Sequence, residues 1–439
     1  MSARTSKILA IGLVATAVIT VAVMWQLREP PPLPPDHSQI EPGDRFDNAE
    51  DAVDYYRTLV RREPDNAAAQ VRLAHALMQY GEESGTQFET VPEAQQLLEG
   101  AVEARPGDIY ARALLASLYN ILHRFEDGRD LSRELLEERP YFAYVHGTLI
   151  DALVELGEYD EAVEASDRLQ SLKPGLPAYS RASYIRELYG DTEGAIEAMQ
   201  LAANAAPIGR SERSWALFQL GNLYLGDAKP DTARVIFEGA LEEMPDFAPA
   251  LAGLGHVALV EGDADRAVQL IEEARSLRPM EMMDELLVEA YAAAGDQAQS
   301  DAAAERVLVA LQRARDMGEI VDMEEADFLL DLGRDLEGSL VKAREQQARR
   351  PGHMHANETL AWALHKNGRS AEGIPYIERA MRLDTGDAMV HYRAAQIYEG
   401  AGQLDEAARH YRIALDGNLD VESPTTADEA RVLLGRIEA

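Results

Sequence analysis

Prolines recur along most of this 439-residue chain at a nearly constant spacing. Four of the six intervals in the series are 33 or 34 residues long, and the other two are 38 and 42. A series of glycines repeats with a similar spacing. Two markers with one common period indicate a tandem array of a single supersecondary unit. The prolines are Pro64, Pro106, Pro140, Pro174, Pro207, Pro245 and Pro279, and the glycines are Gly157, Gly190, Gly262, Gly295, Gly333, Gly368 and Gly402.

The unit is clearest at residues 214–247, which have the pattern of two amphipathic helices joined by a short turn. The turn contains Gly226 and Pro230, residues that interrupt helices. Neither helix can bury its apolar stripe alone, so neighbouring units must stack to make a continuous core. The sequence therefore predicts an all-α solenoid. The helically spaced apolar or small residues are Leu217, Leu220, Gly221 and Tyr224 in the first helix and Ala233, Phe237 and Ala240 in the second.

These positions resemble the tetratricopeptide repeat, whose pattern is Leu-Gly, Tyr, Ala, an aromatic residue, Ala and Pro. The resemblance covers residues 47–421 and is also clear at 254–279 and 395–414. It implies a right-handed superhelix of about ten helix-turn-helix repeats, with the first helix of each repeat on the concave side. Residues 328–373 also resemble the end of a group of uncharacterised bacterial repeat proteins.

The pattern departs from the repeat at several places. Residues 282–351 keep helical periodicity but lose the Ala-aromatic-Ala seam, which predicts a longer, shifted helix pair or a hinge. Residues 81–90 predict a loop inserted between the helices of the first full repeat. Pro375 predicts that the helix around it begins late or kinks. Residues 422–439 predict a C-terminal capping helix, with Ser423 as its N-cap.

Residues 1–28 predict a membrane anchor. Residues 8–25 contain no charge and no proline, and at about 1.5 Å per residue they nearly cross a hydrocarbon core of about 30 Å. Arg4 and Lys7 precede this stretch, so the positive-inside rule keeps the N-terminus in the cytoplasm. The alternative is a cleaved signal peptide and a secreted protein. The length of the apolar stretch and the lack of a small-residue cleavage site favour the anchor.

Residues 29–46 predict a linker, because their five closely spaced prolines favour an extended, semi-rigid polyproline conformation. With the anchor, the linker predicts a single-pass protein of the bacterial inner membrane. The bulk of the chain would then lie outside the cytoplasm, in the periplasm.

The composition excludes several classes of function. The net charge is −35, whereas a nucleic-acid binder needs a basic face, so we predict no nucleic-acid partner. Cysteine is absent, which excludes disulfides, thiolate metal sites and cysteine nucleophiles. The sequence has no phosphate-binding loop, nucleophile elbow or HExxH motif. His353, His355 and His365 form the densest histidine group but lack further metal-ligand motifs. We therefore predict no catalytic site, cofactor or metal.

The resemblance places several side chains on the concave face, where an extended or helical peptide of a partner protein would bind. Aromatic residues there are candidate anchors, although each tryptophan could equally fill space between stacked helices. The candidates for partner binding are Trp215, Phe218, Asn222, His355, Trp362, His365 and Lys366.

The sequence therefore predicts a non-enzymatic scaffold that is anchored in the membrane and holds proteins of an envelope, secretion or transport complex. The acidic composition favours a basic or neutral partner. The alternative is an accessory subunit that binds a small ligand or metal, or regulates a neighbouring enzyme or transporter, through residues 353–366.

Overall fold

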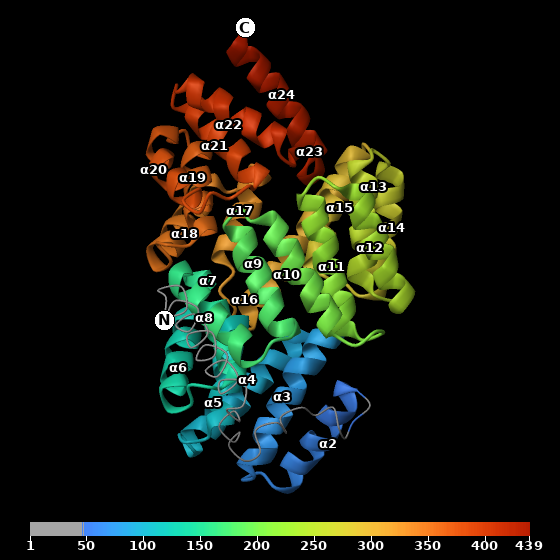
Figure 1. The fold of residues 1–439 in the computed structure, drawn as a ribbon, viewed down its shortest axis with the longest axis vertical. Coiled ribbons are helices and arrows are strands. Elements are labelled where there is room, and N and C mark those ends of the chain that lie inside the picture. Colours follow the sequence, from blue (N-terminus) through green and yellow to red (C-terminus); the bar gives the residue numbers. More distant parts are fainter. Residues whose placement is uncertain (1–45, 47) are drawn as a thin grey trace, which may run out of the picture.

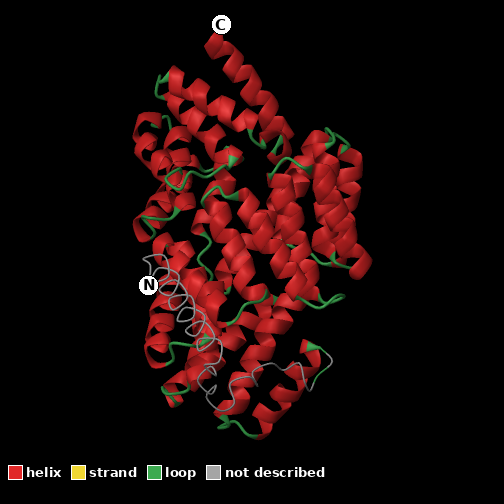
Figure 2. Ribbon diagram, viewed as in Figure 1, coloured by secondary structure: helices red, strands yellow, loops and turns green. Residues whose placement is uncertain are grey.

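The computed structural model describes residues 46 and 48–439. The predicted anchor (1–28) and all of the predicted linker (29–46) except Phe46 therefore lie outside the described residues. Within the described part, helices are joined by short turns and no strand is present (Figure 2). None of these helices combines the length and apolar character needed to cross a bilayer. The described chain is all-α, as the repeat pattern predicts.

A single helix, α2 (Ala49–Arg62), opens the described part, and ten helix pairs follow it. The first five pairs are α3 (Ala67–Ser84) with α4 (Gln87–Ala104), α5 (Ile109–Ile121) with α6 (Phe125–Glu138), α7 (Ala143–Leu156) with α8 (Tyr159–Leu172), α9 (Leu176–Leu188) with α10 (Thr192–Ala205), and α11 (Ser211–Gly226) with α12 (Pro230–Glu243).

The chain then continues through five more pairs and two final helices. The pairs are α13 (Ala248–Val260) with α14 (Ala264–Leu277), α15 (Glu281–Ala293) with α16 (Gln297–Asp316), α17 (Asp322–Asp331) with α18 (Leu336–Arg349), α19 (Met354–Lys366) with α20 (Ser370–Ala380), and α21 (Ala388–Gly400) with α22 (Leu404–Asp416). The final helices are α23 (Leu419–Glu422) and α24 (Pro424–Glu438), and the Ser423 side chain caps the start of α24.

The turns inside the pairs follow from local chemistry. Gly262 has a φ of 79°, in the left-handed region where glycine is favoured. Asp263 comes next and its side chain accepts a hydrogen bond from the Arg266 backbone N–H, which caps α14. The same Gly-Asp arrangement starts α10 and α16. The glycine period in the sequence thus reflects these left-handed turns.

The core repeats a contact between small and large residues. Phe237 on α12 is fully buried, and its ring lies where a Cβ on Gly221 or Gly253 would have to sit. The close approach of α11 and α13 to this ring explains why both positions carry glycine. Burying such a ring contributes about 2–3 kcal/mol, and other repeats bury apolar clusters of their own along the array.

The structure resolves the places where the sequence departs from the repeat. Residues 81–90 do not form the predicted loop: the extra residues lengthen α3 and α4 to 18 residues each, with Gly85 in the left-handed turn between them. In the 282–351 region, α16 is 20 residues long and reaches back to α4, where the Arg313 guanidinium lies 5.6 Å from the Phe88 ring centre.

Helices α16 to α18 return to the side of α4 to α8. In Figure 1, α18 lies next to α7, although more than 170 residues separate them in sequence, and Arg350 after α18 lies 3.5 Å from Glu155 of α7. The turn between α16 and α17 forms a backbone hydrogen bond of 3.2 Å from the Ile320 N–H to the Leu122 carbonyl oxygen. This return of the chain brings side chains from both halves of the solenoid together.

Candidate functional site

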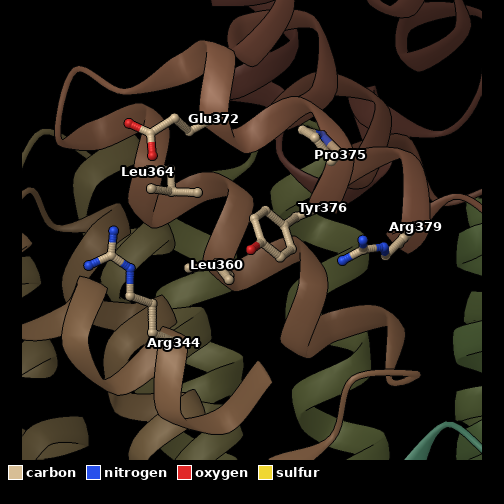
Figure 3. A pocket seen from close by; sticks show the side chains of 7 residues that line it. All are labelled: Arg344, Leu360, Leu364, Glu372, Pro375, Tyr376 and Arg379. Atoms are coloured by element: carbon tan, nitrogen blue, oxygen red, sulfur yellow. The ribbon is translucent and has the colours of Figure 1, made fainter. Parts of the chain in front are cut away.

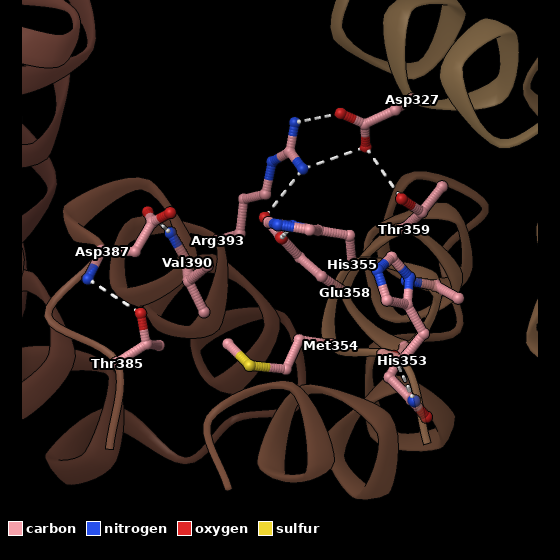
Figure 4. Close-up of polar contacts among 12 residues, drawn as sticks. Asp327, His353, Met354, His355, Glu358, Thr359, Thr385, Asp387, Val390 and Arg393 are labelled. Carbon is pink, nitrogen blue, oxygen red and sulfur yellow. Dashed lines mark hydrogen bonds and ion pairs between the residues drawn. The ribbon is translucent and has the colours of Figure 1, made fainter. Parts of the chain in front are cut away.

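A buried arginine joins the first helices of three successive repeats. Arg393 of α21 is only 6% exposed. Its guanidinium donates to both carboxylate oxygens of Asp327 on α17, at 3.0 and 3.1 Å, and to Glu358 of α19 at 2.9 Å (Figure 4). A further hydrogen bond of 2.8 Å reaches Asp331. Burial works against the charge of Arg393, but the three carboxylates outweigh it and raise its pKa well above the ordinary value.

Trp362 and His355 extend this network. The Trp362 indole N–H donates to Asp331 at 2.8 Å, and the Arg393 guanidinium lies 5.5 Å from the Trp362 ring centre. His355 lies 3.2 Å from Glu358, and this hydrogen bond raises the pKa of His355 to about 9. The imidazole is therefore a cation at neutral pH. We call Asp327, Asp331, His355, Glu358, Trp362 and Arg393 the arginine network.

Close by, turns from the two halves of the chain are in direct contact. A Cβ on Gly352 would lie 2.8 Å from the Gly157 carbonyl oxygen. The Met354 N–H donates to the Tyr159 hydroxyl at 3.0 Å, and the Arg382 guanidinium donates to the carbonyl oxygens of Gly157 and Gly352 at 3.0 and 2.9 Å. We call this group of residues, which joins the α7–α8 turn to the α18–α19 turn, the closure contact.

Charged groups border the closure contact. Arg350 and His353 are both buried and face Glu155 of α7, at 3.5 and 3.6 Å. Burial raises the pKa of Glu155 and lowers that of His353 well below its ordinary value. His353 is thus neutral at pH 7, and its Nδ1 accepts the Ala356 N–H at 3.3 Å as the N-cap of α19.

Carboxylates from several first helices gather on the same interior side. Glu281, Glu285 and Glu289 lie one helical turn apart on α15, which puts them on one face. Burial raises the pKa of all three, and that of Glu281 rises to about 7. Burial also raises the pKa of Glu187 on α9.

Carboxylates of other helices act on these groups. The charge of Glu324 raises the pKa of both Glu155 and Glu281, that of Asp327 raises the pKa of Glu285, and that of Asp387 raises the pKa of Glu187. Carboxylates of α17 and the start of α21 therefore act on groups of α7, α9 and α15, while the positive charges of Arg350 and His355 lower the pKa of Glu155. We call Glu155, Glu187, Glu281, Glu285 and Glu289 the acidic inner face.

The predicted partner-binding residues fall into two separate groups. His355 and Trp362 belong to the arginine network, and His365 stacks on Trp362 with 5.1 Å between ring centres. Lys366 lies 4.8 Å from the Trp362 ring centre. Trp362 is buried, so it fills space between helices rather than standing exposed in a groove.

The other group belongs to α11, which lies apart from α19 in Figure 1. Trp215 is 39% exposed and remains available to a partner. Phe218 is buried, with its ring centre 6.0 Å from that of Phe237, so it is part of the core. Asn222 is half-buried and donates to Gln219 at 3.3 Å.

Reasoning from the sequence missed Arg393 and two of its carboxylate partners, Asp327 and Asp331. A signal was present, because Asp327, Glu358 and Arg393 occupy nearly equivalent positions in α17, α19 and α21. Oppositely charged residues at one inner position of successive first helices indicate ion pairs between neighbouring repeats. Among the described residues, no group of three or more His, Asp or Glu side chains is arranged to hold a metal ion.

Comparisons with known proteins identify the repeat. Two family models described as tetratricopeptide repeat match residues 45–83 and 224–287. A curated relative, cellulose synthase operon protein C of Pseudomonas fluorescens, is 27% identical over 168 residues. That match covers 36% of this chain and 13% of the relative, so the chain matches only a small part of that protein. The chain thus contains tetratricopeptide repeats.

Solved structures of repeat proteins are also similar. A tetratricopeptide repeat protein from Parabacteroides merdae is 19% identical, with a TM-score of 0.44, and the match covers 54% of this chain and 91% of that one. The Cut9–Hcn1 hetero-tetramer structure of the APC/C is 13% identical, with a TM-score of 0.40, over 89% of this chain and 93% of that one.

Proposed function

Because this chain contains tetratricopeptide repeats, we propose that it is a non-enzymatic scaffold that holds a segment of a partner protein against its acidic inner face. The observation that carries the proposal is the convergence of carboxylates from α7, α9 and α15 on one interior side. Repeat solenoids bind partners on such extended surfaces.

The charges favour a basic partner segment. The raised pKa values show that the charged forms of these carboxylates are disfavoured, mainly because they have lost water and partly because other carboxylates lie near. Lysine or arginine side chains of a partner would relieve this repulsion and speed association. Tyr184 is 40% exposed, and the charges of Glu155 and Glu187 act on it, so it offers the segment an aromatic contact.

The finer architecture and the location are part of this proposal. Residues 1–28 anchor the chain in the bacterial inner membrane, residues 29–46 space the array from the bilayer, and the repeats form a right-handed superhelix in the periplasm. The apolar stretch at 8–25 with Arg4 and Lys7 before it supports this arrangement. Cell fractionation tests it: the protein should stay in the membrane pellet after a salt wash. Release at the size expected for cleavage near residue 28 would contradict the anchor.

The kind of complex is also a proposal. We place the scaffold in an envelope, secretion or transport complex. The relative named as a cellulose synthase operon protein adds a polysaccharide-synthesis complex to the candidates. Crosslinking in native membranes followed by affinity purification would identify the partner, and recovery of the protein alone would argue against a scaffold.

The basic-partner proposal has a direct test with the full chain in detergent. Fluorescence anisotropy should show binding of a labelled poly(Arg-Ala) peptide and no binding of poly(Glu-Ala). Replacing Glu281, Glu285 and Glu289 with glutamine should weaken the binding. The matched control replaces Asp231, Glu238 and Glu242 of α12 instead, which removes the same number of carboxyl groups from a second helix. Equal weakening by both triple variants would mean that only net charge attracts the peptide, and the proposed site would be wrong.

A further inference from the structure

A small hollow lies on α18–α20, away from the acidic inner face. Its volume is about 310 Å³, at the low end of the range for ligand sites. Leu360 and Leu364 of α19 form an apolar floor, and the Tyr376 ring lies beside them (Figure 3). The remaining lining residues are Arg344, Glu372, Pro375 and Arg379.

The hollow arises where α20 departs from the repeat. Pro375 lies inside this helix, which begins at Ser370 rather than late and has only 11 residues, whereas α18 has 14. A Cβ on Gly373 would lie 2.9 Å from the Ala361 carbonyl oxygen, so the start of α20 presses closely on α19. The short helix therefore leaves a hollow beside α18, although Leu360 and Leu364 of α19 below it are each only 2% exposed.

The rim carries positive charge in a strongly acidic chain. Among the described residues, neither Arg344 nor Arg379 has a carboxylate within ion-pair distance, and Arg379 lies 5.3 Å from the Tyr376 ring centre. The one carboxylate of the lining, Glu372, is held by Arg369 through hydrogen bonds of 2.7 and 2.5 Å. Figure 3 shows Arg344 and Arg379 on opposite sides of the apolar floor.

We propose that this hollow binds an organic carboxylate with a short apolar body. The apolar part would lie mainly against Pro375 and the Tyr376 ring, and the carboxylate would accept hydrogen bonds from Arg344 or Arg379. A guanidinium suits this role because its planar N–H groups match the two oxygens of a carboxylate. The volume equals that of about ten water molecules at about 30 Å³ each, which limits the ligand to a small molecule or one terminal residue of a peptide.

The test uses hexanoate as the probe, with the full chain in detergent. Saturation-transfer NMR should detect hexanoate binding, while hexanol and hexylammonium should bind more weakly. Arg344→Gln and Arg379→Gln should each weaken hexanoate binding about two- to fivefold, as expected for a partly exposed ion pair. Arg412→Gln, which removes an exposed arginine from α22, is the matched control and should leave the binding unchanged.

Two sources of the carboxylate can be separated. A peptide ending in a free C-terminal leucine and the same peptide with an amidated end would show whether a protein terminus competes with hexanoate. If hexanol binds as tightly as hexanoate, or if all three arginine variants bind alike, the carboxylate site does not exist. No binding of any probe would equally refute it. The hollow is separate from the acidic inner face, so the experiments can refute one proposed site without refuting the other.

Discussion

Arg393 and Glu358 lie 2.9 Å apart, both almost fully buried, on the first helices of two successive repeats. Taking two charges out of water is costly, and here the cost is offset because Arg393 also bonds Asp327 and Asp331. Arg393 and its three carboxylate partners therefore link three repeats, and these hydrogen bonds require the helices to keep one register. We infer that they fix how α17, α19 and α21 stack.

Arg393→Met should destabilise the C-terminal repeats. The variant leaves Glu358 buried without its main partner, a loss that costs about 3 kcal/mol. Hydrogen exchange of the α17, α19 and α21 amides should show the loss as faster local opening, while α5 should keep its protection. Adding Glu358→Leu should restore part of the stability, since it removes the unpaired charge. A double variant no more stable than the single one would contradict this account.

The pH dependence of the same repeats should report His355. Its folded-state pKa of about 9 lies above the ordinary value of about 6.5. Because the pKa is raised, the contribution to stability is complete below about pH 6.5 and is lost as the pH rises through 9. Hydrogen exchange at α19 should therefore indicate falling stability between pH 7 and 9.5, after correction for intrinsic exchange. His355→Gln should show a smaller fall, and an equal fall in both proteins would exclude His355 as the cause.

Most of the fold could be predicted from the repeat period of the sequence. Helix pairs, left-handed glycine turns and the contact of Phe237 with Gly221 all depend on residues a few positions apart or one repeat apart, which a linear pattern records. The closure contact depends instead on Gly157 meeting Gly352. No pattern of one period relates two turns so distant, because their meeting depends on the accumulated twist of the repeats between them.

The candidate site was harder to predict from the sequence for a similar reason. Trp215 and Trp362 look alike in the repeat frame, since both lie on first helices. Their exposure differs because Asp331 and Arg393, from neighbouring repeats, enclose Trp362. The identity of a residue and its helical position predict the side it faces, but neighbouring side chains decide how much of it remains open to a partner.

Comparing two glycine variants should show how much the closure contact contributes to stability. Gly157 and Gly262 have φ angles of 73° and 79°, so alanine is strained by about 1 kcal/mol at either position. A Cβ on Gly262 meets no atom within 4 Å, whereas one on Gly157 collides with the backbone of Gly352 and His353. Gly157→Ala should therefore cost more stability and release the protection of residues 350–354. Equal effects of the two substitutions would show that the contact contributes nothing.

Binding of a basic peptide should depend on the protonation of Glu281. Its pKa is raised to about 7, mainly by burial, so the carboxyl is largely protonated at pH 6 and charged at pH 8. A cationic ligand favours the charged form, and the affinity for poly(Arg-Ala) should therefore rise as the pH rises through 7. Glu281→Gln should flatten this rise. A variant with the same pH profile as the natural protein would exclude Glu281 from the site.

Variants of the two described tryptophans should have different effects on stability and on partner binding. Trp362→Phe keeps an aromatic ring but removes the N–H that donates to Asp331, and it should cost about 1 kcal/mol in the C-terminal repeats. Trp215 is 39% exposed but packs with the rest of its surface, so Trp215→Ala should cost about 1–2 kcal/mol around α11 and leave the C-terminal repeats unchanged.

The binding readout then decides which tryptophan contacts a partner. If the inner side of α11 belongs to the binding surface, Trp215→Ala should weaken capture of the native partner from membranes while hydrogen exchange shows that α11 remains folded. The matched control is Val235→Ala on α12, which trims another exposed apolar side chain. If Trp215→Ala captures the partner as well as the natural protein does, α11 is not part of the binding surface, because Phe218 of this helix is buried in the core. The acidic inner face would then remain as the proposed contact.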